Sequence, residues 1–163
     1  MNIQAVLGLA ERYGIFIVFL VVFLEYMNMP GFPAGVILPF VGAWAAKGHS
    51  FLGTLLITIA AGVSGSLIIY YIGRIGGTRL IEKYANKSAK MKKKFEDLTS
   101  MIKKKGGYAV FLAKLIPVVR TLVGIPAGAL GMKLPCYFVS SLLGIAVWNS
   151  VLFCAGYFLG KGF

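Results

Sequence analysis

Two long stretches of the chain, residues 51–73 and 136–160, contain no charged side chain. Each is long enough to cross the ~30 Å hydrocarbon core of a bilayer as one helix, which takes about 20 apolar residues. Two further apolar stretches, residues 13–46 and 107–133, are interrupted by proline and glycine. Because proline removes a backbone donor and clashes with the preceding turn, we expect these two stretches to form broken helical hairpins. The pattern predicts one membrane domain over residues 1–163.

The order of these elements occurs twice: a broken hairpin and then an uninterrupted span. The tripeptide Pro-Ala-Gly appears in both hairpins, at residues 33–35 and 126–128. We therefore expect an all-α integral membrane fold in which two re-entrant hairpins enter from opposite leaflets as an inverted repeat. Residues 1–12 are expected to add an amphipathic helix at the membrane surface. Four or more complete spans without re-entrant hairpins form the alternative topology.

The stretch between the two repeats, residues 74–106, is strongly basic. It contains 11 of the 17 lysines and arginines of the chain, whose formal net charge is +12. By the positive-inside rule we expect it to be a cytoplasmic loop of a multi-pass protein, helical over residues 78–104. Attraction to anionic lipid headgroups is compatible with this, because each basic side chain near the surface contributes roughly 1 kcal/mol. No aromatic platform for nucleic acid accompanies the lysines, so no nucleic-acid partner is expected.

Composition supports a membrane protein and leaves little for metal chemistry. Hydrophobic residues make up 58% of the chain and its mean hydropathy is +0.82, against about 45–50% apolar residues in soluble domains. Cys136 and Cys154 lie in one expected helix, about 27 Å apart, so they cannot form a disulfide there. His49 is the single histidine. We therefore expect no metal site and no cofactor.

Three ionisable residues stand inside the interrupted apolar stretches: Glu25 in the first, Lys114 and Arg120 in the second. A charge at membrane depth costs roughly 2.5–3.5 kcal/mol on insertion scales, so such residues are candidates for function. Arginine's planar fork matches a phosphate and lysine adds a compact charge. A helix break at Pro117 would let both cations converge on an anionic headgroup. The alternative is a Glu25–Arg120 salt bridge that only holds the fold.

Three motifs lie in and between these elements: LEYMNMPGFPAG, GSLIIYYIGRIGG, and KLIP followed closely by RTLVGIPAGALGM. Together they resemble the DedA family, the bacterial branch of the VTT-domain (SNARE-associated) membrane proteins, over about residues 15–160. The resemblance implies a multi-pass protein of the bacterial cell membrane that moves lipids between leaflets as a flippase or scramblase. The residues to which it gives structural roles are Pro30, Pro33, Gly35, Gly73, Arg74, Gly77, Pro117, Pro126 and Gly128.

The chain departs from the family pattern at three positions. Gly35 stands where many members have an acid, Ser66 where they have an acid or an amide, and Lys114 where they have an arginine. The resemblance implies a substrate site that contains Ser66 and Tyr70 together with the three charged residues.

Relatives of this kind carry either undecaprenyl phosphate or phosphatidylethanolamine. We expect the headgroup phosphate to bind Arg120 and Lys114 and an ammonium group to bind Glu25, which favours phosphatidylethanolamine. Undecaprenyl phosphate, the lipid carrier of the cell envelope, is the alternative, and a proton-coupled ion exchanger or channel is a further one.

An enzyme is not expected. The string GVSG at residues 62–65 fits the serine motif of intramembrane proteases, but that chemistry needs a histidine base, and His49 is expected outside the membrane. Small residues that allow close helix packing explain the string better. The small-residue motifs GRIGG and CAGYFLGKG indicate either contacts of a homo-oligomer or internal packing.

Overall fold

The computed structural model describes four stretches of the chain, residues 3–27, 35–86, 88–117 and 119–162. Within them all regular structure is helical. Pro30 and Pro33, to which structural roles were assigned, lie outside the described residues. The helices in chain order are α1 (Ile3–Tyr26), α2 (Ile37–Ala45), α3 (Phe51–Ala85), α4 (Ala89–Lys105), α5 (Gly107–Lys114), α6 (Val119–Leu122), α7 (Gly124–Ala129) and α8 (Leu134–Lys161).

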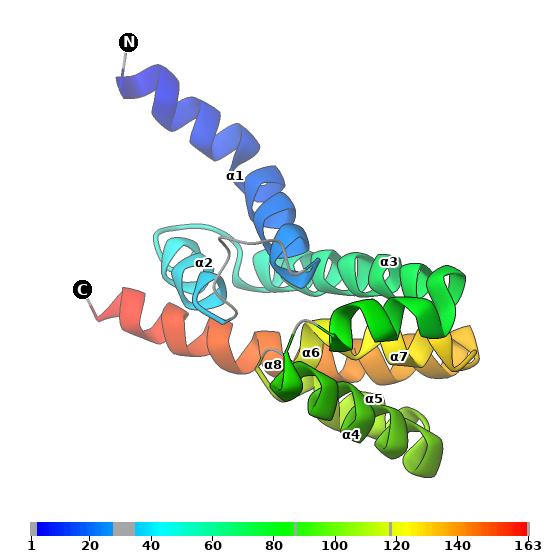
Figure 1. Cartoon of the computed structure of the whole chain (residues 1–163). Helices are drawn as coiled ribbons and strands as arrows, with labels where there is room; N and C mark the ends of the chain where they lie inside the picture. Colours follow the sequence, from blue (N-terminus) through cyan, green and yellow to red (C-terminus); the bar gives the residue numbers. More distant parts are fainter. Residues whose placement is uncertain (1–2, 28–34, 87, 118, 163) are drawn as a thin grey trace.

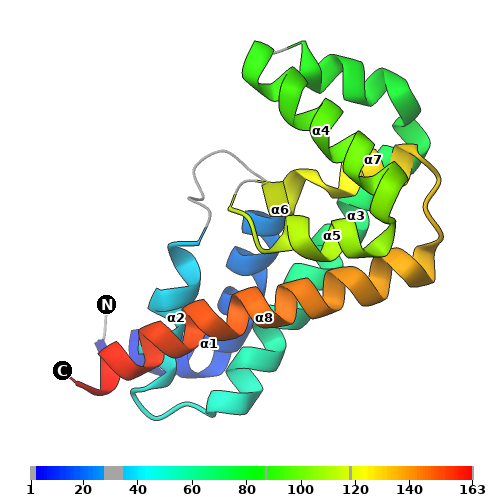
Figure 2. The same ribbon diagram turned by 90° about the horizontal axis from the view of Figure 1, so that it is seen from below.

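The two uninterrupted apolar stretches form the long helices α3 and α8, which lie side by side through the molecule (Figures 1 and 2). Both contain a segment long and apolar enough to cross a membrane, Phe51–Lys83 and Leu134–Lys161. The expected all-helical fold with two candidate spans is therefore confirmed. Helix α3 continues past the predicted end of the span to Ala85, with one break in its helical geometry at Gly77 (φ 53°).

The remaining helices pack on this pair in a crossed pattern. In the first half, α1 packs on α3 and α2 packs on α8; in the second half, α5 packs on α8 and α7 packs on α3. The first arm of each hairpin (α1 or α5) thus lies on the long helix of its own half. The second arm (α2 or α7) lies on the long helix of the other half. The two halves therefore exchange their second arms in the same way, which agrees with an internal repeat. Insertion of the hairpins from opposite leaflets stays a prediction.

Glycines make the two crossings of second arms and long helices possible. A Cβ atom at Gly128 in α7 would overlap the carbonyl oxygen of Tyr70 in α3, and one at Gly156 in α8 would overlap the carbonyl oxygen of Pro39 in α2. Gly73 lies against α7 in the same way. Gly73 of GRIGG and Gly156 and Gly160 of CAGYFLGKG thus serve internal packing at these crossings.

The N-terminal part differs from the prediction. Residues 1–12 were expected to form a separate interfacial helix before a hairpin that begins at residue 13, but α1 is one continuous helix from Ile3 to Tyr26. The sequence contains no proline or glycine between Leu9 and Tyr13, so nothing interrupts the backbone hydrogen bonds there. The first arm is therefore longer than predicted.

The basic loop folds as an antiparallel helical hairpin instead of one helix. Its first arm is the end of α3 beyond Gly77, and its second arm is α4, which begins where the hydroxyl of Ser88 accepts a hydrogen bond from the Met91 N–H (3.2 Å). Such a cap satisfies one of the free donors of a helix start. The apolar stripe of α4 is buried at Phe95, Leu98 and Ile102, which leaves its lysines on the outside.

The second hairpin consists of three short helices. Helix α5 ends at Lys114, residues 115–117 are non-helical, and α6 and α7 complete the second arm. Pro117 lies in the break, as expected from its missing N–H. Pro126 is the third residue of α7, in the first turn, where a missing donor costs little.

Candidate functional site

Glu25 and Arg120 form a buried ion pair between the two hairpins. Glu25 is in the last turn of α1 and Arg120 is in α6, and they are 2% and 0% exposed. Arg120 Nη2 donates to Glu25 Oε1, which also accepts the Gly35 N–H at 2.8 Å. Both arms of the first hairpin are thereby tied to the second hairpin by one carboxylate oxygen. Gly35 contributes its backbone donor.

Lys114 lies next to this pair but has other partners. Its ammonium group, 1% exposed, donates to Ser66 Oγ (2.6 Å) in α3 and to the carbonyl oxygen of Arg120 (2.9 Å). Ser66 Oγ in turn is 2.6 Å from the Tyr137 hydroxyl. The break in the second hairpin therefore brings Lys114 and Arg120 together, as the hypothesis required. Lys114 contacts the main chain of Arg120, and its ammonium is held by α3.

An aromatic surround encloses the guanidinium. Arg120 Cζ is 4.5 Å from the centre of the Tyr26 ring and 5.3 Å from that of Trp148, distances at which a cation interacts with the ring faces. The Tyr26 hydroxyl donates to Asn149 Oδ1 at 2.7 Å. Sequence reasoning missed Tyr26, Trp148 and Asn149. The sequence did offer one sign of this cluster. Asn149 is an amide in the middle of an apolar span, where its side chain needs a hydrogen-bond partner.

Several polar atoms around the ion pair have no hydrogen-bond partner among the described protein atoms. The donors are Arg120 Nε and Nη1, Trp148 Nε1 and Asn149 Nδ2, and the acceptor Glu25 Oε2 is also unpartnered. All are buried. A buried donor without a partner costs about 1–3 kcal/mol, and more for a charged group, so such atoms are rare unless an ordered water or a ligand uses them. The group is rich in N–H donors and surrounds one cation, which suits an anion.

Tyr70 makes its hydrogen bonds and ring contacts with groups other than the ion pair. Its hydroxyl donates to the carbonyl oxygen of Met132 and accepts from Arg74 Nη1 at 2.7 Å. Its ring stacks on Tyr137, with the centres 4.5 Å apart. Tyr70 therefore joins α3 to the segment between α7 and α8, and reaches the Lys114 cluster only through Tyr137. Arg74 supports Tyr70 from one turn away.

Ser64 and His49, the residues of the protease alternative, have separate contacts of their own. The Ser64 hydroxyl donates to the Ala60 carbonyl oxygen of its own helix at 2.8 Å. The His49 ring stacks on Trp44, with the ring centres 3.7 Å apart. Both contacts are those of packing residues. Among the described residues no three metal-ligating side chains are grouped as a metal site would need.

Comparison with known proteins places the chain in a family. The model of the VTT domain matches residues 15–158. An alkaline phosphatase-like protein of Lactococcus lactis is 34% identical, over 96% of this chain and 76% of its own length. Undecaprenyl phosphate transporter A of Staphylococcus aureus is 34% identical over 98% and 81%. Protein DedA of Escherichia coli is 28% identical over 93% and 73%. No solved structure matches significantly. The resemblance predicted from the three motifs is confirmed, and the chain belongs to the DedA family of VTT-domain membrane proteins.

Proposed function

We propose that this protein moves a lipid phosphate between the leaflets of a membrane, with the phosphate bound at Arg120. The substrate we favour is a polyprenyl phosphate. Relatives in Staphylococcus aureus and Bacillus subtilis that cover most of this chain are named undecaprenyl phosphate transporter A. The geometry of the site supports an anionic ligand independently of those names.

The main support for the proposal is the Arg120 guanidinium, of which only part is hydrogen-bonded to the protein. Arg120 uses Nη2 for Glu25, while Nε and Nη1 have no protein partner. The unpartnered Trp148 Nε1 belongs to a ring over which the guanidinium lies, and Asn149 is the next residue. A phosphate monoester has three strong acceptor oxygens and binds arginine in a bidentate manner. It would satisfy donors that are otherwise buried at a cost.

The pair also provides a means of coupling binding to movement. A phosphate that takes the guanidinium competes with Glu25 Oε1, the atom that ties both arms of the first hairpin to α6. Substrate binding would therefore weaken the link between the hairpins, and release would restore it. A ligand shifts a conformational equilibrium only through such differences in contact. The lipid tail stays in the hydrocarbon while the headgroup crosses.

Phosphatidylethanolamine is the second candidate, and Glu25 Oε2 is the observation that favours it. This oxygen is unpartnered and could accept an ammonium group. The other oxygen is already shared by Arg120 and the Gly35 N–H. The ammonium group of a zwitterionic headgroup would therefore find one free carboxylate oxygen, Glu25 Oε2. A phosphate monoester would find several unpartnered N–H donors. This difference is the reason for ranking polyprenyl phosphate first.

Transport of defined lipids in proteoliposomes tests the proposal. Fluorescent short-chain polyprenyl phosphate and fluorescent phosphatidylethanolamine are incorporated separately, and the outer leaflet is quenched with dithionite. We expect the wild-type chain to accelerate the crossing of polyprenyl phosphate, Arg120→Gln to abolish it, and Trp148→Phe to slow it. The chain's second tryptophan offers a matched control, because Trp44 lies away from the ion pair, against His49. Trp44→Phe should leave the rate unchanged.

Two results would contradict the proposal. One is lipid movement at the wild-type rate by a folded Arg120→Gln protein. The other is ion conductance without lipid movement, which would favour the channel alternative. Faster crossing of phosphatidylethanolamine than of polyprenyl phosphate would keep the transport proposal and reverse the choice of substrate.

A further inference from the structure

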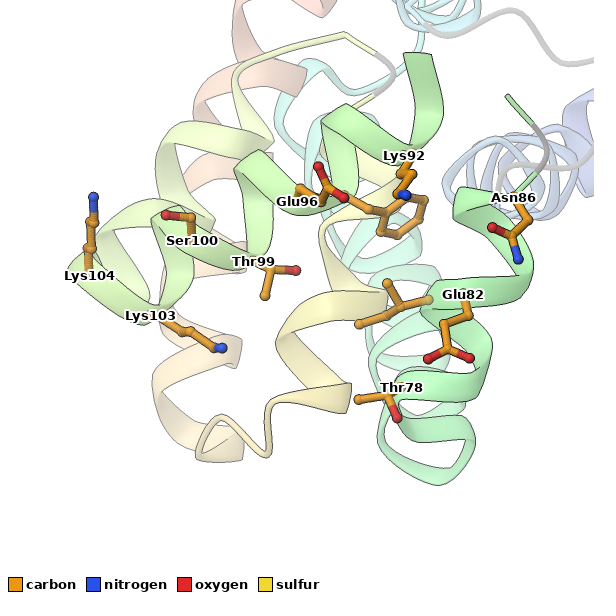
Figure 3. A pocket seen from close by; sticks show the side chains of 11 residues that line it. Thr78, Glu82, Asn86, Lys92, Glu96, Thr99, Ser100, Lys103 and Lys104 are labelled. Carbon is orange, nitrogen blue, oxygen red and sulfur yellow. The ribbon is translucent and has the colours of Figure 1, made fainter. Parts of the chain in front are cut away.

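A second polar site lies outside the membrane-embedded cluster, between the two arms of the basic hairpin. The end of α3 and the length of α4 enclose a groove of about 700 Å³, within the range of ligand pockets. Figure 3 shows Thr78, Glu82 and Asn86 along the α3 side, and Thr99 and Lys103 along the α4 side. The groove is thus formed by the only segment that joins the two repeats.

The charge around this groove is strongly positive. Helix α4 contains seven lysines and two acids, and its apolar residues are turned inward, so the lysines stay outside. Lys92, Lys103 and Lys104 line the groove itself. The floor is apolar because Phe95 is buried there, with Ile81 opposite.

The lining has a second, hydrogen-bonding character. Glu82 and Glu96, with the hydroxyls of Thr99 and Ser100, offer acceptors for hydroxyl groups. Lysines supply point charges for a phosphate. The combination suits a headgroup that carries both a phosphate and hydroxyls.

We expect the groove to lie near one surface of the membrane, because it is lined by the charged end of α3 and by the lysine-rich α4. The span of α3 keeps exposed apolar side chains up to Ile75, which is 87% exposed, and the groove begins at Thr78. Between them Gly77 turns the helix, with φ 53°. Tyr71 and Tyr108 are also exposed, and exposed tyrosines are common at membrane interfaces.

We propose that this groove binds the headgroup of an anionic, hydroxyl-bearing phospholipid of the phosphatidylglycerol type, as an accessory lipid separate from the transported one. Basic clusters next to the end of a membrane helix are attracted to anionic lipid surfaces. The groove would also select a headgroup by its size and hydrogen-bonding groups. Its lysines hold the phosphate, its acids and hydroxyls hold the headgroup hydroxyls, and the half-buried Ile81 contacts the glycerol end of the chains.

Native mass spectrometry of the purified full chain tests lipid binding directly and does not depend on transport. The protein is mixed with phosphatidylglycerol or phosphatidylcholine in detergent. We expect the wild type to retain one phosphatidylglycerol at concentrations where phosphatidylcholine is lost. The variant Lys92→Gln/Lys103→Gln should bind phosphatidylglycerol at least about tenfold more weakly, because each lysine near a lipid surface contributes measurably.

A control with the same loss of charge separates a site from general attraction. Lys93 and Lys105 belong to α4 but do not line the groove, so Lys93→Gln/Lys105→Gln should bind like the wild type. Thr99→Trp fills the groove without changing charge and should also lose the lipid. Equal weakening by both double variants would overturn the proposal in favour of diffuse surface attraction. Binding of the Thr99→Trp protein at wild-type affinity, or equal retention of the two lipids, would overturn it as well.

Discussion

Ser66 in α3 and Asn149 in α8 occupy corresponding places in the two halves of the molecule. Each is a buried polar residue that hydrogen-bonds the hydroxyl of a buried tyrosine from the opposite half, Ser66 with Tyr137 at 2.6 Å and Asn149 with Tyr26 at 2.7 Å. Each also lies seven residues before a glycine, Gly73 or Gly156, at which the helix touches a second arm.

This correspondence gives the two long helices related roles at the candidate site. Through Ser66, α3 holds the ammonium of Lys114. Through Asn149 and its neighbour Trp148, α8 lies beside the guanidinium of Arg120. Lys114 is thus bound by the long helix of the first half, and Arg120 is contacted by the long helix of the second half. Substitutions on α3 and α8 should therefore affect stability and transport in separable ways.

Removing the Ser66 hydroxyl is expected to destabilise the protein. Of the hydrogen bonds that Lys114 makes to Ser66 and to the Arg120 carbonyl oxygen, the second would remain, and an under-satisfied buried charged donor costs about 1–3 kcal/mol or more. Ser66→Ala should therefore lower the melting temperature in detergent. Ser64→Ala is the matched control two residues away, since Ser64 bonds only its own helix. An equal melting temperature for Ser66→Ala and the wild type would show that Lys114 does not rely on this hydroxyl.

The ion pair allows its structural and functional roles to be separated. Glu25→Ala leaves Arg120 buried without its counter-ion, which is expected to cost about 3–5 kcal/mol. Replacing both partners by apolar residues, Glu25→Leu/Arg120→Met, should recover much of that stability because no lone charge remains. We expect the double variant to fold but not to transport, as measured by melting temperature and by the vesicle assay. A folded double variant that still moves lipid phosphate would mean that the pair only holds the hairpins together.

The glycine crossings should not tolerate a methyl group. A Cβ at Gly128 would overlap the Tyr70 carbonyl oxygen and crowd the Arg74 nitrogen. Overpacking of this kind typically costs about 1–3 kcal/mol, and backbone atoms cannot move aside as a side chain can. Gly128→Ala and Gly156→Ala should both lower the melting temperature. At Gly162 the added Cβ would meet atoms at ordinary contact distance, so Gly162→Ala should behave as the wild type.

Topology can be read from the accessibility of single cysteines. In a chain with Cys136→Ser and Cys154→Ser, a cysteine at Ser100 reports on the basic hairpin and one at Ser50 on the turn before α3. Both serines are exposed. We expect a membrane-impermeant maleimide to label Ser50→Cys in intact cells and to label Ser100→Cys only after permeabilisation. Labelling of Ser100→Cys from outside would reverse the predicted orientation.

Local patterns in the sequence predicted much of the fold. The uncharged stretches became α3 and α8, because only a helix satisfies its own backbone in lipid. Pro117 marked the break in the second hairpin. The Glu25–Arg120 contact was among the expectations as the salt-bridge alternative, because two opposite charges inside apolar segments are expensive unless paired.

The parts that were missed depend on contacts between distant segments. Tyr26 and Trp148 meet the guanidinium, and Asn149 meets the Tyr26 hydroxyl, only because α1, α6 and α8 come together. Taken alone, an aromatic residue in an apolar span is indistinguishable from a packing residue. The continuity of α1 was missed for a different reason. The prediction ends a separate interfacial helix at residue 12, but no proline stands there to interrupt the backbone hydrogen bonds, and the helix continues to Tyr26.

Because each half packs its second arm on the long helix of the other half, the two halves depend on each other for their core. Helix α2 packs on α8 and α7 packs on α3, so either half expressed alone would leave one arm and one face of its long helix without a surface to cover them. We therefore expect that neither half folds on its own. With the opposite orientations predicted for the two halves, a single half could complete this core only by pairing with a second copy inserted upside down, and a gene encoding one half would then have to insert its product in both orientations.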